Sequence, residues 1–215
     1  MINKRQWLLF LVLILVSPIT NAQDSEPAQW QRVMQQLASH DISQGHFKQS
    51  KHLKILKKPI VSSGNFALLR DHGLIWNTVD PLSATIVIVN RRIYQLPNHE
   101  KRLLIEENQQ GTASTLLSIL SGNLTTLEQS FEIEPHNKNG GWSLKLKPKD
   151  EALAKVFSLL ILEGAQQLNA AKLLEPQGTQ TIIEFSQITN TPLSSDQLML
   201  LSEQPSSPNK QTDEL

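Results

Sequence analysis

Histidine side chains are the first candidates for chemistry in this 215-residue chain, because imidazole binds metal ions and transfers protons. His99-Glu100 resembles the start of a zinc-protease helix, but Leu103 occupies the position where the second histidine is required. His46 and His52 fall on one side of an expected strand at a separation of about 20 Å, too far apart to share an ion. None of the six histidines pairs at metal-ligand spacing, so we expect surface histidines and no metal site.

Nucleophilic residues offer no better pattern. The chain has no cysteine, which removes thiolate chemistry, disulfides and thiolate metal sites. The sequence also contains neither a Gly-x-Ser-x-Gly elbow nor a P-loop. Ser62-Ser63-Gly64 lies inside an expected strand, where a nucleophile is poorly exposed. We therefore predict that the protein is not an enzyme, has no catalytic residues and needs no cofactor.

The charge balance excludes one class of partner. Twenty basic and twenty acidic side chains cancel, and loss of Lys4 and Arg5 with residues 1–22 would leave 18 against 20. Nucleic-acid binding needs concentrated positive charge, so we expect no nucleic-acid partner.

Residues 1–22 have the pattern of a secretory signal peptide. Lys4 and Arg5 precede an apolar run, and small residues lead to a cleavage site after Ala22. The run has about ten residues, whereas a transmembrane helix needs about 20, although an uncleaved N-terminal anchor is the alternative. Gln23 stands where a lipoprotein would carry its acylated cysteine. We expect an exported chain without a lipid anchor of its own.

The rest of the chain predicts many strands and two helices. Apolar residues spaced three and four apart predict helices over residues 30–37 and 113–120. Trp142, Leu144 and Leu146 alternate with polar residues, which is typical of a strand with one face in the core. The expected strands cover residues 47–55, 60–69, 74–79, 85–89, 93–96, 103–106, 129–134, 142–147, 157–162, 166–174 and 179–188.

Such a strand count predicts a mainly β (α+β) fold. A strongly curved antiparallel sheet or incomplete barrel is the natural architecture, and its aliphatic inner face could enclose an apolar cavity. We expect one domain over residues 23–200, followed by a polar, disordered tail over residues 201–215.

Five lysines lie along the first expected strand and in the turn after it: Lys48, Lys51, Lys54, Lys57 and Lys58. One interpretation is a solvated strand face that protects a sheet edge from pairing. The other is a docking patch for an acidic partner or for anionic lipid headgroups.

The region from Gly45 to Pro81 carries a resemblance to a known family. Gly45-His-Phe-Lys-Gln49 is followed by Ser63-Gly64-Asn-Phe66, then by Arg70 and Trp76 at intervals of six residues, then by Pro81. In this order and spacing the chain resembles LolA, the periplasmic carrier that moves lipoproteins from the inner to the outer membrane of Gram-negative bacteria. The resemblance covers about residues 28–190. The part after Ile188 matches poorly, which is compatible with a divergent relative.

The resemblance implies an unclosed antiparallel β-barrel of about ten to eleven strands, with a helical lid enclosing an apolar cavity. It implies that Arg70 is the latch between lid and barrel, although a surface arginine at a turn is the alternative. The implied lid residues, which could equally be ordinary core, are Leu116, Leu117, Ile119 and Leu120. The implied cavity-lining residues, most of which could also be ordinary packing, are Phe66, Leu74, Trp76, Ile86, Ile88, Trp142 and Leu144.

The implied function is that of a monomeric periplasmic carrier of acylated lipoprotein. Its partners would be an inner-membrane donor complex and an outer-membrane acceptor. Two alternatives stay open: a carrier of another envelope lipid, such as a glycolipid or fatty-acyl species, and a lipid-responsive envelope sensor.

Overall fold

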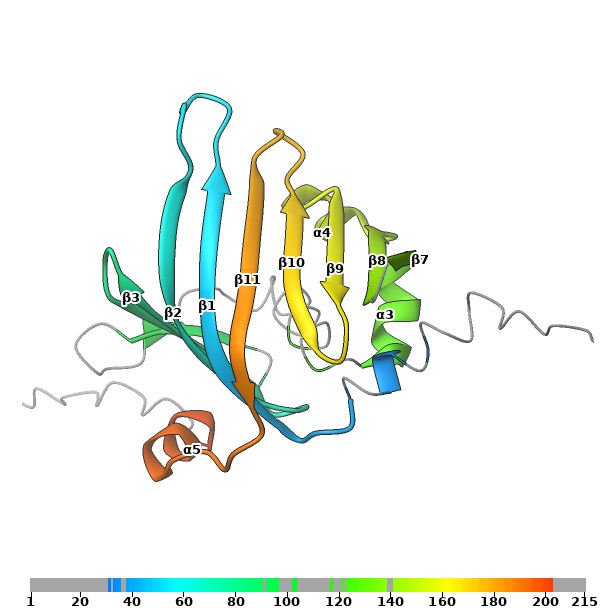
Figure 1. Ribbon diagram of the computed structural model, residues 1–215. Coiled ribbons are helices and arrows are strands. Elements are labelled where there is room, and N and C mark those ends of the chain that lie inside the picture. The colour runs from blue at the N-terminus through cyan, green and yellow to red at the C-terminus, as the bar shows by residue number, and fades with distance from the viewer. Residues whose placement is uncertain are drawn as a thin grey trace, which may run out of the picture.

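The structure is a computed structural model that describes residues 31, 33–35, 38–90, 92–96, 102–103, 117, 121, 123–138 and 141–202 (Figure 1). The expected signal peptide over residues 1–22 lies outside the described residues. Leu116, Ile119 and Leu120 of the expected lid helix also lie outside them, whereas Leu117 is helical and buried.

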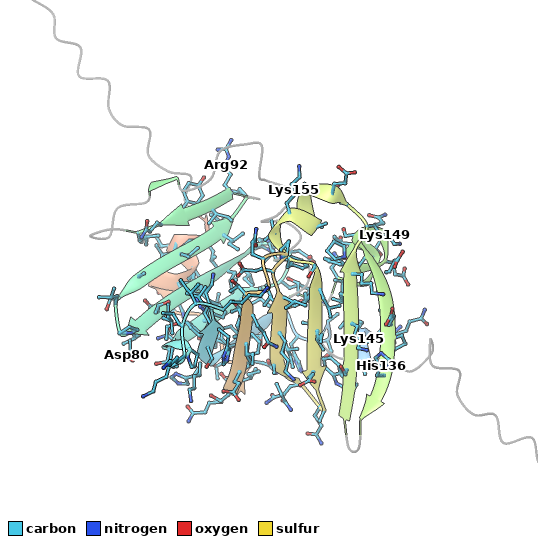
Figure 2. The ribbon with its side chains drawn as sticks, turned by 90° about the horizontal axis from the view of Figure 1, so that it is seen from above. Asp80, Arg92, His136, Lys145, Lys149 and Lys155 are labelled. Atoms are coloured by element: carbon cyan, nitrogen blue, oxygen red, sulfur yellow. The ribbon has the colours of Figure 1, made fainter. Side chains whose placement is uncertain are left out.

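Among the described residues, eleven antiparallel strands form one sheet in the order β6-β5-β4-β3-β2-β1-β11-β10-β9-β8-β7. Strands β6 and β7 are its two edges, and the sheet curves without closing (Figures 1 and 2). The predicted mainly β, unclosed architecture of about ten to eleven strands is therefore confirmed. The strands are β1 (Ile42–His52), β2 (Ile60–Leu69), β3 (Gly73–Asp80), β4 (Ala84–Val89), β5 (Arg92–Gln95), β6 (Arg102–Leu103), β7 (Phe131–Lys138), β8 (Gly141–Pro148), β9 (Leu159–Gly164), β10 (Leu168–Leu174) and β11 (Gln180–Thr189).

Three labelled helices accompany the sheet: α3 (Leu124–Ser130), α4 (Glu151–Val156) and α5 (Ser195–Ser202). Asn123 caps α3 by accepting a hydrogen bond from the Thr126 N–H at 3.1 Å. Asp150 caps α4 by accepting from the Ala152 N–H at 2.8 Å. The strand expected over residues 129–134 is therefore wrong at its start, because the cap at Asn123 begins a helix that runs to Ser130.

Two further boundaries differ from the expectation. β1 begins at Ile42 and ends at His52, so Ile55 falls in the β1–β2 turn, where 89% of it is exposed. Helix α5 continues to Ser202, two residues beyond the expected domain end, because Leu201 is buried in the apolar cluster beneath it.

The two faces of the sheet bury separate apolar clusters. The larger cluster includes residues of ten strands, all except β6, on one face, together with Leu127 of α3 and Leu153 of α4. The smaller cluster places Leu193 and Leu201 against the opposite face of β2, β3 and β4, with α5 lying against β3 and β4. Since both faces of β2 to β4 are covered in this region, these strands contain continuous apolar runs instead of strict alternation.

Gly64 marks a close approach between β2 and β3. The β2–β3 register shifts between Ser63 and Gly64. A Cβ atom at Gly64 would overlap the Asn77 carbonyl group on β3.

Gly64→Ala is expected to lower the free energy of unfolding by about 1–3 kcal/mol, because the methyl group forces two paired strands apart. Chemical denaturation compared with Ser62→Ala, a substitution on the same strand, measures the effect. Equal stability of the two variants would show that the strands yield at this point without cost.

Candidate functional site

An apolar pocket of about 160 Å³ opens on the face of the sheet that carries the larger cluster. Its aromatic residues are Phe66 of β2, Trp76 of β3 and Phe185 of β11. Aliphatic side chains complete the apolar lining: Leu68, Leu74, Leu168 and Ile188. The pocket therefore collects side chains from both halves of the sheet, where β1 and β11 join them.

The aromatic residues form a connected cluster. Phe47 of β1 stacks on Trp76 with ring centroids 3.8 Å apart, and Phe66 meets Phe185 edge-to-face at 5.4 Å. Gly64 lies opposite Phe47 on the intervening strand β2, so no side chain separates β1 from β3 at this point. The missing side chain allows the Phe47 ring to reach Trp76, and the cluster gives the pocket a wall that spans four strands.

Polar groups gather at one end of the pocket. They come from the start of β1, the residues after β2 and β11, and the β9–β10 turn: His40, Ser43, Arg70, Gln166, Gln167 and Asn190. A pocket with an apolar interior and polar groups at one end suits a ligand with an apolar chain and a polar head.

Arg70 ties the end of β2 to the segment before β1. Its Nε donates a hydrogen bond to the His40 carbonyl at 3.2 Å, and its Nη2 lies 3.5 Å from Asp41 Oδ1. The Arg70 side chain is 20% exposed and its charge partner is Asp41, not the adjacent Asp71. Arg70 therefore holds the connection that leads from helical residues 33–35 into the sheet.

A second cavity, of about 230 Å³, adjoins the first and shares two residues with it, Arg70 and Ser121. Ser121 follows the helical residue Leu117, and its N–H donates to the Leu117 carbonyl at 2.8 Å. The buried Ser121 Oγ has no hydrogen-bond partner among the described residues. An unpaired buried hydroxyl that lines the same two cavities as a guanidinium is a position where a ligand oxygen would be favoured.

The predicted site residues fall into three groups. Arg70, Phe66, Leu74 and Trp76 line the first pocket. Ile88, Trp142, Leu144 and Leu117 belong to the larger buried cluster, and the partly buried Ile86 packs against it, but none of these five is among the pocket-lining residues. Leu116, Ile119 and Leu120 lie outside the described residues. Their roles toward cargo stay predictions.

Several pocket residues were missed from the sequence, although alternation offered a signal for some. Leu68 has the same parity as Phe66 on β2, and Phe185 lies directly opposite Phe47 in the β1–β11 register. Leu168 and the β9–β10 turn residues carry no sequence signal that places them near β2, because that contact depends on the curvature of the whole sheet.

Ionisable groups show no arrangement for metal binding in the part of the chain that the structure describes, where no three His, Asp or Glu residues cluster. A hydrogen bond from Lys147, reinforced by the lysine charge, lowers the pKa of Glu134. This pair lies on β7 and β8, and neither residue lines the pocket.

Among the described residues, no helix is both long and apolar enough to cross a membrane. The fold and the pocket together define an open half-barrel, a curved antiparallel sheet that shelters an apolar cavity on one face. The chain belongs to the LolA family: the family model described as "Outer membrane lipoprotein carrier protein LolA" matches residues 39–199. This match confirms the resemblance seen in the sequence.

Solved structures similar to this chain have low sequence identity. A LolA superfamily protein from Nitrosomonas europaea is 8% identical with a TM-score of 0.44, over 77% of this chain and 95% of that one. The complex of Pseudomonas aeruginosa MucA and MucB matches at 13% identity and a TM-score of 0.42, over 80% of this chain and 60% of the matched chain. The lipoprotein LppX of Mycobacterium tuberculosis matches at 9% identity with a TM-score of 0.42, over 80% of this chain and 99% of that one. No curated protein matches the sequence.

Proposed function

We propose that this protein is a periplasmic carrier that shields the acyl chains of lipoproteins in its apolar cavity and shuttles them from the inner to the outer membrane. The observation that carries the proposal is the pocket bounded by Phe66, Trp76 and Phe185 in a chain of the LolA family. An acyl chain gains roughly 0.8 kcal/mol for each CH₂ group removed from water, so cargo with two or three chains needs shielding to cross an aqueous space.

The size of the pocket implies movement during loading. Its volume of about 160 Å³ is below the roughly 300–1,000 Å³ of typical ligand pockets. Cargo with several acyl chains would therefore require elements over the concave face to move apart. Leu117 is buried in the larger cluster, and Ser121 lines both cavities. Their positions support a lid that includes these two residues.

The remaining roles follow from this proposal. The lid helix would include Leu116, Leu117, Ile119 and Leu120, and Arg70 would act as the latch. Residues 1–22 would direct export and be cleaved after Ala22, and the carrier would work as a monomer between a donor complex and an acceptor.

Native mass spectrometry with lipid extraction, on protein purified from the periplasm, tests the function directly. A co-purifying lipidated protein is the expected result. A free glycolipid or fatty-acyl species would replace the proposed cargo with another envelope lipid. A protein without any ligand would favour the sensor alternative.

Arg70→Leu is expected to slow the release of a bound fluorescent fatty acid. In this proposal the loaded state is open and the empty state is closed. The variant loses the contacts to His40 and Asp41 that favour the closed, empty state. A partly exposed ion pair contributes about 0.5–1 kcal/mol, so the release rate should fall about two- to fivefold. Stopped-flow release into acceptor vesicles measures the change, with Arg70→Lys as the charge-conserving control. An unchanged release rate would remove Arg70 from the mechanism.

A further inference from the structure

The β1–β2 hairpin ends in a tip that exposes apolar side chains. Figure 1 shows this hairpin projecting beyond the neighbouring strands, at the opposite end from α5. Ile55 is 89% exposed and Leu56 is 46% exposed, and Ile60 and Val61 at the start of β2 are also exposed. Single exposed apolar residues are ordinary, but four within one protruding hairpin form a patch that needs an explanation.

The same hairpin is strongly basic. Lys54, Lys57 and Lys58 stand in the turn, and no acidic residue occurs in the sequence between Asp41 and Asp71. Lys51 on β1 pairs with Glu175 at 3.2 Å. Within the described part of the chain, the three turn lysines have no ion-pair partner.

Protection of a sheet edge does not explain these lysines. β1 lies between β2 and β11 and is paired on both sides, so it is not an edge strand. The edge interpretation of the lysine run is therefore wrong. The docking interpretation accounts for the charges that surround the exposed apolar tip.

The β10–β11 turn contacts the β1–β2 turn beside the hairpin tip. The Lys54 side chain lies against Gly178 in the β10–β11 turn, where any larger residue would meet it. Gly178 has a φ of +80°, a conformation that glycine adopts without strain. This contact leaves Ile55 and Leu56 as the exposed point of the hairpin.

We propose that residues 53–61 dock the protein on a bilayer of anionic phospholipids, with Ile55 and Leu56 entering the interface and the lysines binding headgroups. Apolar residues flanked by lysines are the composition of interfacial membrane anchors. A narrow convex tip suits a fluid interface better than a protein partner, whose stable contact needs about 800 Å² of matching surface.

The geometry of the sheet gives this docking a direction. The polar end of the pocket, with Ser43 and Arg70, lies at the other end of β1 and β2 from the hairpin tip. The eleven residues of β1 span about 36 Å. A chain docked through its hairpin would therefore hold the polar end of the pocket away from the bilayer surface, free for a second partner.

Vesicle flotation tests the proposal, using protein purified from the periplasm and vesicles of phosphatidylcholine with or without phosphatidylglycerol. We expect binding to the anionic vesicles that weakens as salt is raised. Exchanging Lys54, Lys57 and Lys58 together for glutamine should reduce the vesicle affinity about a hundredfold, at roughly fivefold for each lysine. The matched control exchanges Lys145 on β8, Lys149 in the β8–α4 connection and Lys155 on α4, all on the other arm of the molecule (Figure 2), and should bind as the natural protein does.

A second variant separates insertion from charge. Ile55→Ser with Leu56→Ser keeps every lysine, and should reduce vesicle affinity roughly tenfold while leaving the salt dependence in place. Failure of the natural protein to float, or equal loss in the control variant, would overturn the proposal. Capture by an acidic protein without vesicle binding would also overturn it. Because the readout is vesicle binding, the result is independent of whether the pocket holds acyl chains.

Discussion

Replacement of Phe47 by alanine is expected to lower the free energy of unfolding by about 3–5 kcal/mol, the range typical of a buried phenylalanine. Phe47 is 3% exposed and stacks on Trp76 at the junction of the two halves of the sheet. The truncated side chain would leave a cavity that β2 cannot fill, because Gly64 stands opposite on that strand. Urea denaturation followed by tryptophan fluorescence measures the loss, and Trp76 itself reports on the site.

Phe47→Leu is the matched control for this prediction. Leucine retains most of the apolar volume but not the stacked ring, so its cost should fall well below that of alanine. Equal costs for the two variants would show that ring stacking, rather than filled volume, stabilises the junction. A loss below about 1 kcal/mol for Phe47→Ala would contradict the assignment of this residue to the core.

The strand pattern was readable from sequence wherever one face of the sheet is buried. Trp142, Leu144 and Leu146 point inward on β8, as their alternation predicted, and Lys147 is exposed. The pattern was harder to read at β2 to β4, because α5 covers the face opposite the pocket. Ala67, Ile75 and Val87 are buried on that face, so both faces of these strands carry apolar side chains. Period alone therefore could not identify which face meets the pocket.

The short helices were missed for a different reason. Helices α3 and α4 have seven and six residues, too few for a helical repeat to show in apolar spacing. Their signals are the caps Asn123 and Asp150, whose side chains satisfy backbone N–H groups at the helix starts. A search for cap residues, in addition to periodicity, would have found both.

The candidate site was predictable only in part, since it depends on contacts between residues distant in sequence. Phe66 and Trp76 share a face through β2–β3 pairing, a local relation that alternation reveals. Phe185 joins them because β11 pairs with β1 across more than a hundred residues of sequence. Arg70 was identified through the family resemblance, and its contacts to His40 and Asp41 required the folded chain.

Ser43→Trp is expected to reduce the affinity for a fluorescent fatty acid at least about tenfold, which corresponds to about 1.4 kcal/mol. Ser43 lies on β1 opposite Leu68, and both residues line the pocket. An indole at this position would occupy space that a ligand needs in a cavity of about 160 Å³. Because the indole would fill a cavity and remove no packed group, thermal stability should change little, so the variant separates binding from folding. Equilibrium titration of the fatty acid measures the affinity.

Ser186→Trp is the matched control, since Ser186 is exposed on β11 and is not among the pocket-lining residues. Phe185 points into the pocket, so its neighbour Ser186 points to the other face of the sheet. The control should bind the fatty acid with the affinity of the natural protein. If Ser43→Trp also retained full affinity, acyl chains would have to bind outside this pocket. If both variants lost affinity together, the loss would reflect a general effect of added tryptophan on the sheet.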